Sequence, residues 1–242
     1  MKLCVIPARG GSKRIPRKNI RPFLGRPILA YSIEAARESG LFDRIMVSTD
    51  DVEIAEIAHG LGAEIPFMRP AELADEHTGT NAVVRQAIQW HATQGSSVTH
   101  ACCIYATAPF VQVRDLREGL DRLLSSGKSF VFSVTAYTHP VQRALRLNAR
   151  GEIEALYPEY RNTRSQDLEP AYHDAGQFYW GTAAAFVDDV ATFSSAALPV
   201  ILPPYLVQDI DTEEDWRRAE LMYQALVQSQ IIAAKDQEPP HE

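Results

Sequence analysis

Three features are scarce in this chain, and each scarcity excludes a class of protein. No apolar run approaches the roughly 18 residues of a membrane-spanning helix, so we expect no membrane partner. Cysteine occurs only at Cys4, Cys102 and Cys103, without the paired spacing of metal ligands. This excludes a disulfide or zinc framework and predicts buried thiols in a reducing compartment, the cytoplasm. Basic residues are the minority, with 24 Lys and Arg against 31 Asp and Glu, which argues against nucleic-acid binding.

Acidic residues are also missing from the entire N-terminal stretch before Glu34, and basic residues gather there. The sequence VIPARGGSKRIPRKNI, residues 5–20, places five of them around a Gly-Gly-Ser turn: Arg9, Lys13, Arg14, Arg17 and Lys18. Such a local concentration in a chain of net charge −7 favours a small polyanionic ligand. A polyphosphate carries enough charge to account for it, whereas one carboxylate does not. The alternative is a solvated basic surface loop, but such runs are usually helical or rich in lysine.

Two familiar phosphate-binding motifs are absent, so this stretch, the basic loop (residues 8–20), must hold an anion in another way. The chain contains neither a P-loop pattern nor a Gly-x-Gly-x-x-Gly fingerprint at a strand end. Gly10 and Gly11 would let the backbone approach the ligand and direct its N–H groups toward it. Lys13 and Lys18 would reach separate phosphoryl oxygens, and Arg9 would offer a two-pronged contact.

Short apolar strands alternate with helical patterns up to Ala136. We expect strands at residues 2–8 and 44–49, a third, short extended piece at 63–70, and strands at 100–106 and 129–135. Helices are expected at 26–40 and about 81–94, with one more that has Ile54, Ile57, Ala58 and Leu61 on one face and another that has Leu116, Leu120, Leu123 and Leu124 facing inward. This alternation predicts an α/β fold with a mostly parallel sheet and helices on both of its faces. No linker separates two autonomous units, so residues 1–230 are expected to form one domain.

The alternation stops after Ala136. Residues 143–158 have the pattern of a hairpin that turns near Arg150-Gly151, and the polar residues that follow have little periodicity. A long irregular segment inside a compact domain is typical of a lid or an interaction arm, so we expect an arm at about residues 137–175. The sheet is expected to resume at 177–180 and 200–207. A last helix follows, which is capped by Thr212 and Asp215 and is expected to bury Trp216, Ala219, Tyr223 and Leu226. A disordered tail is expected at 231–242.

Asp209 and Asp211 flank Ile210 in an extended segment, so both carboxylates are expected to point the same way. Two hard oxygen ligands beside a triphosphate suit Mg²⁺, for which Mn²⁺ can substitute. The alternative is that Asp211 only caps the following helix. Because Thr212 can do this instead, metal binding is the favoured interpretation.

Four segments resemble, in the same order, those of a known enzyme family: IPARGGSKRIPRKNI, VSTDD, RPAELADEHTGT and QDIDTEEDW. They resemble the nonulosonic acid cytidylyltransferases, the CMP-sialic acid synthetase family, over nearly the whole chain. The segments CCIYATAPF and DAGQFYWG are more similar to the branch that acts on pseudaminic acid. The resemblance implies a single Rossmann-like domain with a dimerisation arm, hence a homodimer, and transfer of CMP from CTP to a nonulosonic acid with release of pyrophosphate.

The resemblance also implies roles for individual residues. The expected catalytic residues are Arg9, Lys13, Lys18 and Asp211, with both lysines neutralising charge on the departing pyrophosphate. The expected nucleotide-binding residues are Arg9, Gly10, Gly11, Ser12, Lys13, Lys18, Asn19, Arg69 and Thr78. Arg69 and Thr78 would lie near the cytosine, although a plain surface position is the alternative for both. Asp209 and Asp211 match the family's metal-binding Asp-x-Asp.

In the sugar site the chain departs from the sialic acid branch. That branch commonly has Gln in a Gln-Pro-Thr-Ser-Pro run, where this chain has Tyr105 in Tyr-Ala-Thr-Ala-Pro. An apolar ring with one hydroxyl suits a sugar with a methyl terminus, such as the 9-deoxy end of pseudaminic acid. Sialic, legionaminic and Kdo-type acids remain alternatives. A non-catalytic nucleotide-sensing module is the other class, and it would be expected to lose one of Lys18, Asp209 or Asp211.

The expected sugar-binding residues are Tyr105, Thr107, Arg143, Arg164, Gln177 and Tyr179. Gln177 and Tyr179 alternate on a strand and would share one face, with core packing as the alternative for Tyr179. Arg143 and Arg164 are candidates for the sugar carboxylate, with a surface position as the alternative. His173 is expected to be structural or to lie at the arm's interface.

Overall fold

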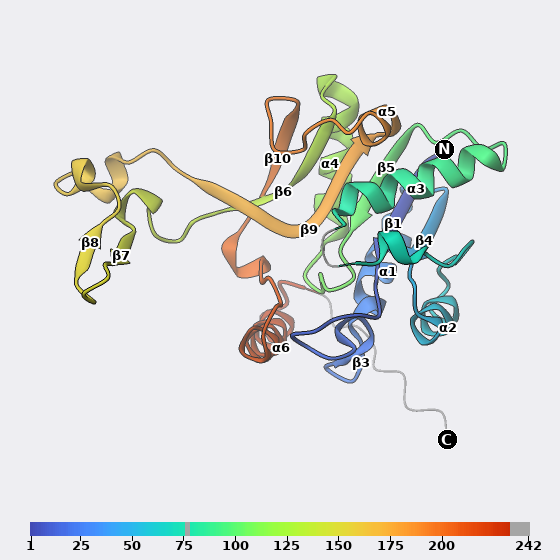
Figure 1. The fold of residues 1–242 in the computed structure, drawn as a ribbon, viewed down its shortest axis with the longest axis horizontal. Coiled ribbons are helices and arrows are strands. Elements are labelled where there is room, and N and C mark those ends of the chain that lie inside the picture. The colour runs from blue at the N-terminus through green and yellow to red at the C-terminus, as the bar shows by residue number, and fades with distance from the viewer. Residues whose placement is uncertain (76–77, 233–242) are drawn as a thin grey trace.

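The computed structural model describes residues 1–75 and 78–232, and its centre is a six-stranded sheet of order β10-β6-β9-β5-β1-β4 (Figure 1). These strands are β1 (Lys2–Pro7), β4 (Arg44–Ser48), β5 (His100–Ile104), β6 (Phe130–Ala136), β9 (Tyr172–Thr182) and β10 (Ala197–Leu202). Strand β9 runs antiparallel to its neighbours β5 and β6, and the other neighbouring pairs are parallel. The predicted mostly parallel sheet is confirmed.

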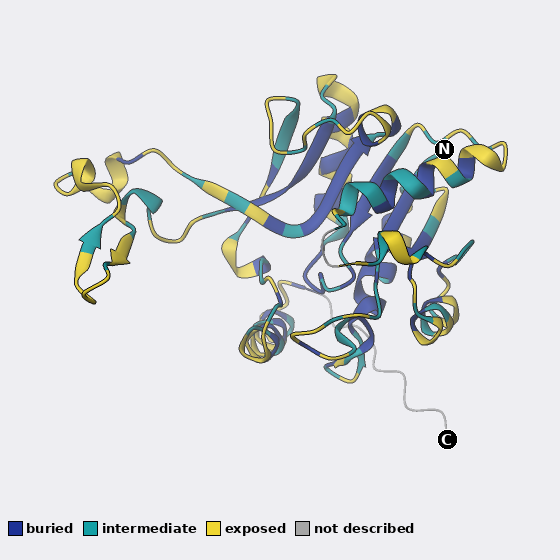
Figure 2. Ribbon diagram, viewed as in Figure 1, coloured by how far each residue is buried: buried dark blue, intermediate teal, exposed yellow. Residues whose placement is uncertain are grey.

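Helices cover both faces of this sheet, because successive residues of a strand point to opposite sides. The helices are α1 (Ile28–Ser39), α2 (Val52–Gly60), α3 (Thr80–Thr93), α4 (Val113–Ser126), α5 (Ala183–Val187) and α6 (Glu213–Gln228). In β1, Cys4 and Ile6 pack with buried residues of α1, α2 and α4, whereas Leu3 and Val5 pack with those of α3 and α5. Figure 2 shows the strands buried between these two layers. No helix in the described part of the chain has the length and apolar character needed to span a bilayer.

Helix α6 supports the basic loop from behind. It begins with the predicted capping box: Asp215 N donates to Thr212 Oγ1 at 3.2 Å, and Thr212 N donates to Asp215 Oδ2 at 2.9 Å. The predicted inward residues of α6 are buried, in a cluster that also contains the fully buried Ile15 and Phe23. Since Ile15 lies within the basic loop, burying it fixes the middle of a segment whose charged side chains face elsewhere.

Three expectations for the core need correction. Residues 63–70 form no strand, since only Glu64 makes a single bridge, to Met46, and the two prolines that follow cannot donate to a ladder. Leu124 is 58% exposed, because it lies one position beyond the buried stripe of α4. Ile232, which falls inside the tail expected from residue 231, is buried against α6 and its neighbours. Residues 233–242 of that tail lie outside the described residues.

Residues 137–171, between β6 and β9, leave the core as a protruding arm (Figure 1). The arm carries the antiparallel pair β7 (Leu145–Leu147) and β8 (Ile153–Ala155), so the predicted hairpin is confirmed. Gly151 in its turn has φ +77°, a conformation that favours glycine. The arm exposes several large apolar side chains: Leu145, Leu147, Ile153, Leu156 and Tyr157. Figure 2 shows this surface far from the buried core.

Candidate active site

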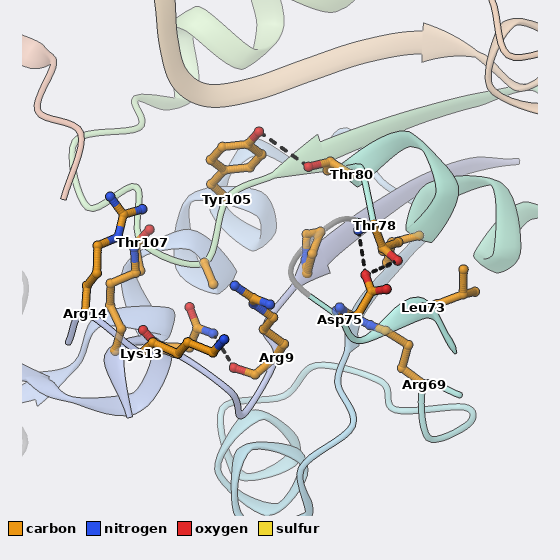
Figure 3. Close-up of a pocket in the computed structure, with 16 residues that line it drawn as sticks. Arg9, Lys13, Arg14, Arg69, Leu73, Asp75, Thr78, Thr80, Tyr105 and Thr107 are labelled. Atoms are coloured by element: carbon orange, nitrogen blue, oxygen red, sulfur yellow. Dashed lines mark hydrogen bonds between the residues drawn. The ribbon is translucent and has the colours of Figure 1, made fainter. Parts of the chain in front are cut away.

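A cavity of about 690 Å³, the first cavity, opens at the carboxyl ends of the parallel strands β1 and β5. An open α/β sheet places its ligands at this edge. The first cavity brings together most of the residues that the sequence predicts for the nucleotide and part of the sugar site: Arg9, Ser12, Lys13, Lys18, Asn19, Arg69, Thr78, Tyr105 and Thr107. In Figure 3, Lys13, Arg14 and Thr107 lie on one side, Arg69, Asp75 and Thr78 on the other, and Arg9 between them.

The basic residues of the loop line this cavity, with the exception of Arg17. Arg9, Lys13, Arg14 and Lys18 line the cavity. Arg17, counted with them in the sequence, instead donates from Nη1 to Asp51 Oδ2 at 2.5 Å and from Nη2 to Asp51 Oδ1 at 2.9 Å. With Arg69, five cationic side chains line one concavity of an acidic chain, and together they form the kind of focused positive potential that holds a polyphosphate.

The predicted role of Gly10 needs correction, whereas that of Gly11 stays a prediction. The N–H of Gly10 donates to Asp50 Oδ1 at 2.9 Å, so it is not offered to a ligand. A Cβ at Gly10 would lie 2.6 Å from Asp51 Oδ2, which means that the close approach of Asp51, not of an anion, requires glycine here. Gly11 faces open space, and neither glycine is among the described residues that line the cavity. The loop therefore presents side chains more than backbone N–H groups.

Asn19 and Lys18 connect the loop to its surroundings. The buried amide of Asn19 donates to Arg9 O at 2.8 Å, which closes the loop upon itself. Lys18 Nζ donates to Ile210 O at 2.7 Å and lies 3.4 Å from Asp211 Oδ1. The structure thus brings the predicted cation close to Asp211 of the predicted metal-binding pair, although the two residues are 193 positions apart in the chain.

Asp209 and Asp211 follow the short 3₁₀ turn η6 (Pro204–Leu206), and they do not lie at the end of a strand as the sequence suggested. The capping box of α6 uses Thr212 and Asp215, so Asp211 is available for another role. Its carboxylate is 2.9 Å from Arg14 Nη2.

The chemistry of this acidic pair fits a divalent cation. Asp209 reaches solvent, but the surface around it partly desolvates its carboxylate. This desolvation is the largest cause that raises the pKa of Asp209, and the negative charge of Asp211 is the second. A bound cation would relieve that repulsion, and carboxylate oxygens are the ligands that Mg²⁺ prefers. No group of three or more His, Cys, Asp or Glu side chains forms a complete metal site in residues 1–75 and 78–232. Phosphate oxygens and water would have to complete the coordination.

Arg69 and Thr78 both have hydrogen-bond partners at the wall of the first cavity, but only Arg69 is buried. Arg69 is only 6% exposed; its Nε donates to Ser48 Oγ at 3.0 Å, its Nη2 donates to Ser48 O, and burial lowers its pKa. Thr78 Oγ1 donates to Asp75 Oδ1 at 2.7 Å. The plain surface position is therefore excluded for Arg69, which forms a fixed wall of the first cavity.

A second cavity, of about 650 Å³, adjoins the first through Thr80 and Tyr105, which line both. The Tyr105 and Thr80 hydroxyl oxygens are 3.4 Å apart (Figure 3). The ring centroids of Tyr105 and Tyr179 are 5.3 Å apart, and Tyr179 Oη donates to Asp174 Oδ2. Burial raises the pKa of both tyrosines, so both hydroxyls stay protonated at neutral pH. The core alternative for Tyr179 is only half right, since it is buried but lines a cavity.

Several residues of the second cavity were missed by sequence reasoning. They are Asn81, Arg85, Asp174, Asp189 and Phe193, of which Arg85 and Asp189 form an ion pair. Asp174 belongs to the DAGQFYWG segment of the sequence analysis. It lies beside an irregularity in the pairing of β6 with β9, and a sequence motif does not predict such an irregularity. The register of β6 with β9 shifts between Phe132 and Val134, and Gly176 has φ +62°.

Gln177 is not a sugar-site residue in this structure. It is 3% exposed, its Nε2 donates to Leu206 O at 2.5 Å, and it is not among the described residues lining either cavity. Its own carbonyl accepts from Tyr105 N at 2.9 Å. The distorted strand around Gly176 explains why the simple alternation with Tyr179 fails. Gln177 instead joins the strand end that carries Tyr105 to the turn that leads to Asp209.

Arg143 and Arg164 lie in the arm, and within the described part of one chain they line neither cavity. Arg143 Nη2 donates to Thr163 O, and Arg164 Nε donates to Asp167 Oδ2 at 2.8 Å. Their predicted contact with the sugar carboxylate is therefore contradicted within a single subunit, because neither is among the described residues that line a cavity and the arm protrudes from the sheet (Figure 1). His173 lies at the root of the arm with its ring 4.8 Å from that of Tyr137, as expected for a structural residue.

Comparison with known proteins agrees with this geometry. A family model described as cytidylyltransferase matches residues 3–179. The chain belongs to the cytidylyltransferase family. It is 44% identical over 221 residues to the pseudaminic acid cytidylyltransferase of Campylobacter jejuni subsp. jejuni serotype O:23/36 (strain 81-176), a match that covers 91% of this chain and 95% of that protein.

Other relatives of this cytidylyltransferase have different sugar acids in their names. It is 31% identical to the CMP-N,N'-diacetyllegionaminic acid synthase of Legionella pneumophila subsp. pneumophila (strain Philadelphia 1), with 93% of this chain and 99% of that protein covered. Among solved structures, CMP:2-keto-3-deoxy-manno-octonic acid synthetase complexed with CTP has the same fold, with a TM-score of 0.68 at 15% identity over 93% of this chain and 99% of that one.

Proposed function

We propose that this cytidylyltransferase transfers CMP from CTP to a nonulosonic acid, with pseudaminic acid as the preferred substrate. The observation that carries the proposal is the pair of adjoining cavities: one lined by cations and one walled by tyrosines, joined at Thr80 and Tyr105. The cations of the first suit a triphosphate, and the tyrosine rings of the second suit a sugar acid with a deoxy terminus. The 44% identity to a pseudaminic acid cytidylyltransferase supports the choice of sugar.

In the proposed reaction, the anomeric hydroxyl of the sugar acid attacks the α-phosphorus of CTP in line. The bond from that phosphorus to the bridging oxygen breaks, pyrophosphate leaves, and the proton of the attacking hydroxyl is released to water. Arg9, Lys13 and Lys18 bind the phosphates and stabilise the charge that grows on the pyrophosphate. Asp209 and Asp211 would hold Mg²⁺, which supplies charge neutralisation at the phosphates when bound. The three buried thiols support a reducing compartment, which we propose to be the cytoplasm.

Pyrophosphate release from CTP tests this proposal directly. The protein would be assayed with a panel of acceptors: pseudaminic, N,N'-diacetyllegionaminic, N-acetylneuraminic and 2-keto-3-deoxy-manno-octonic acid. We expect release that depends on both CTP and the acceptor, with the highest kcat/KM for pseudaminic acid. If no acceptor of the panel leads to release of pyrophosphate, the proposed function is contradicted. A clear preference for another acid would change the substrate while leaving CMP transfer in place.

Tyr105→Gln is expected to weaken use of pseudaminic acid by roughly tenfold or more in kcat/KM while changing CTP affinity little. The Tyr105 ring packs on Tyr179 at the junction of the cavities, where it would cover a deoxy terminus. The same ring leaves the glycerol hydroxyls of sialic acid without partners, at about 1–3 kcal/mol each. Two such losses predict roughly a hundredfold discrimination against sialic acid by the unaltered protein.

Steady-state kinetics with both sugars checks this prediction, and Tyr105→Phe is the matched control. The control keeps the ring and removes only the hydroxyl, whose oxygen is 3.4 Å from Thr80 Oγ1. It should retain the preference for pseudaminic acid. Equal kcat/KM for the two sugars in the unaltered protein would refute the substrate assignment.

We further propose that the protein is a homodimer that forms through the arm. The arm exposes Leu147 and Ile153 by 68% and 64%, on a hairpin that buries little of itself. A second copy of the same surface is a self-complementary partner, and twofold dimers are the commonest oligomers. In the described part of their own chain, Arg143 and Arg164 line neither cavity. In a dimer, they could approach the cavities of the partner subunit.

Leu147→Glu with Ile153→Glu is expected to convert the dimer to a monomer, because the pair would bury two charges at the interface. Light scattering coupled to size exclusion at micromolar concentration measures the mass. Leu221→Glu is the matched control, since Leu221 is 62% exposed on α6, outside the arm, and its replacement should leave the mass unchanged. A monomeric, fully active unaltered protein would refute the dimer.

A further inference from the structure

Arg17 occupies an unusual place in the basic loop. Its φ of +55° and ψ of +28° put it in the left-handed region, which residues other than glycine seldom adopt. Its guanidinium makes a forked contact with both oxygens of Asp51, at 2.5 and 2.9 Å, and its Nη2 also donates to Glu53. The turn at Arg17 directly precedes Lys18, so the orientation of Lys18 depends on how this turn is held.

Asp51 is itself held firmly at the start of α2. Its Oδ1 accepts from Ile54 N at 3.0 Å as the N-cap of the helix, and its N–H donates to Thr49 Oγ1 at 3.1 Å. The carboxylate therefore has a fixed direction before Arg17 binds it. A charged, forked hydrogen bond to a fixed partner is a strong and geometrically specific contact.

The other end of the basic loop is fastened to the same place. Gly10 donates its N–H to Asp50 Oδ1 at 2.9 Å, and its missing Cβ makes room for the Asp51 side chain. The two neighbouring carboxylates thus hold the loop at Gly10 and at Arg17, and the cations Lys13 and Arg14 lie between these two points. The loop is positioned by contacts that face away from the first cavity.

We propose that Asp51 is a positioning residue for CTP, which acts through Arg17 to hold the basic loop in the shape that receives the triphosphate. The inference rests on the proposed function, because it assumes that the triphosphate is the ligand of this loop. A loop that is already ordered loses less conformational entropy on binding, so fastening it raises affinity without any contact to the ligand. Removing the fastening should therefore weaken CTP binding.

The ion pair of Arg17 with Asp51 is charged on both sides at neutral pH. The hydrogen bonds from Arg17, as the largest cause, together with the backbone N–H of Ile54 lower the pKa of Asp51 to about 2. Asp51 is therefore ionised at neutral pH, and its contact with Arg17 forms in the structure without CTP.

Asp51→Asn tests the proposal with little change elsewhere. Asparagine caps helices as well as aspartate does and has the same size beside Gly10, but it cannot accept both donors of the fork as a charged group. We expect the dissociation constant for CTP, measured by calorimetry on the folded variant, to rise by about tenfold or more. The KM for CTP should rise with it, and the KM for the sugar acid should not change.

Glu53→Gln is the matched control for charge. It also removes one negative charge that contacts Arg17, and from electrostatics alone such a loss near a cationic site should strengthen anion binding. We expect CTP affinity within about twofold of the unaltered protein for Glu53→Gln. A loss of CTP affinity by about tenfold in Asp51→Asn, beside a nearly unchanged affinity in Glu53→Gln, separates positioning from simple loss of charge.

Arg17→Lys is the second variant, because it leaves the cap of α2 intact. It keeps the charge but loses the fork, so it should weaken CTP binding in the same direction as Asp51→Asn. The double variant should be little weaker than either single one, since both changes break the same contact. If folded Asp51→Asn and Arg17→Lys bind CTP as well as the unaltered protein, the positioning role is wrong. If the unaltered protein does not bind CTP, it is the proposed function that fails.

Discussion

Lys18→Ala is expected to abolish measurable pyrophosphate release, a loss of at least about 10²–10³-fold in kcat/KM, without unfolding the protein. Lys18 lines the first cavity and belongs to none of the hydrophobic clusters of the described residues, so its side chain contributes charge more than core packing. It also donates to Ile210 O, which ties the basic loop to the segment that carries Asp211. The substitution removes the cation that we propose to stabilise the leaving group, and it also removes the link between the basic loop and the segment of Asp211.

Lys128→Ala is the matched control for this prediction. Lys128 Nζ also donates to a backbone carbonyl, that of Ser195, at 2.8 Å, but at an exposed position away from the cavity. It should keep full activity, and both variants should have melting temperatures within a few degrees of the unaltered protein. Substantial release of pyrophosphate by folded Lys18→Ala would refute the phosphate-binding role of the basic loop.

The parts of the site that the sequence predicts well follow from rules of topology. The basic loop comes directly after β1 and Tyr105 directly after β5, and the carboxyl ends of neighbouring parallel strands meet at one edge. The capping box of α6 was equally readable, because Thr212 and Asp215 interact at a fixed local spacing. Such features depend on neighbours in the chain or on the handed regularity of α/β folds.

The parts that sequence reasoning missed depend on contacts between distant residues. Gly10 is required by Asp51, about forty positions later, and Arg17 is turned out of the cationic cluster by the same carboxylate. Nothing in the composition of a basic loop distinguishes a lysine that faces a ligand from an arginine that holds the loop in place. That distinction appears only when the end of β4 is placed beside the loop.

The sugar side was harder to predict for a second reason. Gln177 and Tyr179 alternate on a strand, but the register shift in the pairing of β9 with β6 breaks the simple relation between spacing and face. Asp174 was missed for the same reason, because bulges are set by tertiary pairing. Arg143 and Arg164 show a further limit, since residues on an arm have their function decided by what the arm contacts.

Asp211→Asn and Asp209→Asn are each expected to lower kcat/KM by at least about 10²-fold and to weaken Mn²⁺ binding in the presence of CTP. Asparagine keeps the size of the side chain but removes the charge that a hard cation requires. Binding of Mn²⁺ can be followed by its paramagnetic resonance signal, which measures the metal without reference to turnover. Asp121→Asn on the exposed face of α4 is the matched control and should change neither quantity.

The two variants should differ in one respect, which makes this test sharper. Asp211 is held by Arg14 at 2.9 Å and lies 3.4 Å from Lys18, whereas Asp209 is partly desolvated beside it. Asp211→Asn therefore also frees two cations of the first cavity, so CTP alone should bind this variant at least as tightly as it binds the unaltered protein, even though turnover is lost. Asp209→Asn leaves those ion pairs intact and should not change CTP binding in the absence of metal. Full activity of the unaltered protein in excess EDTA would rule out the metal role of both residues.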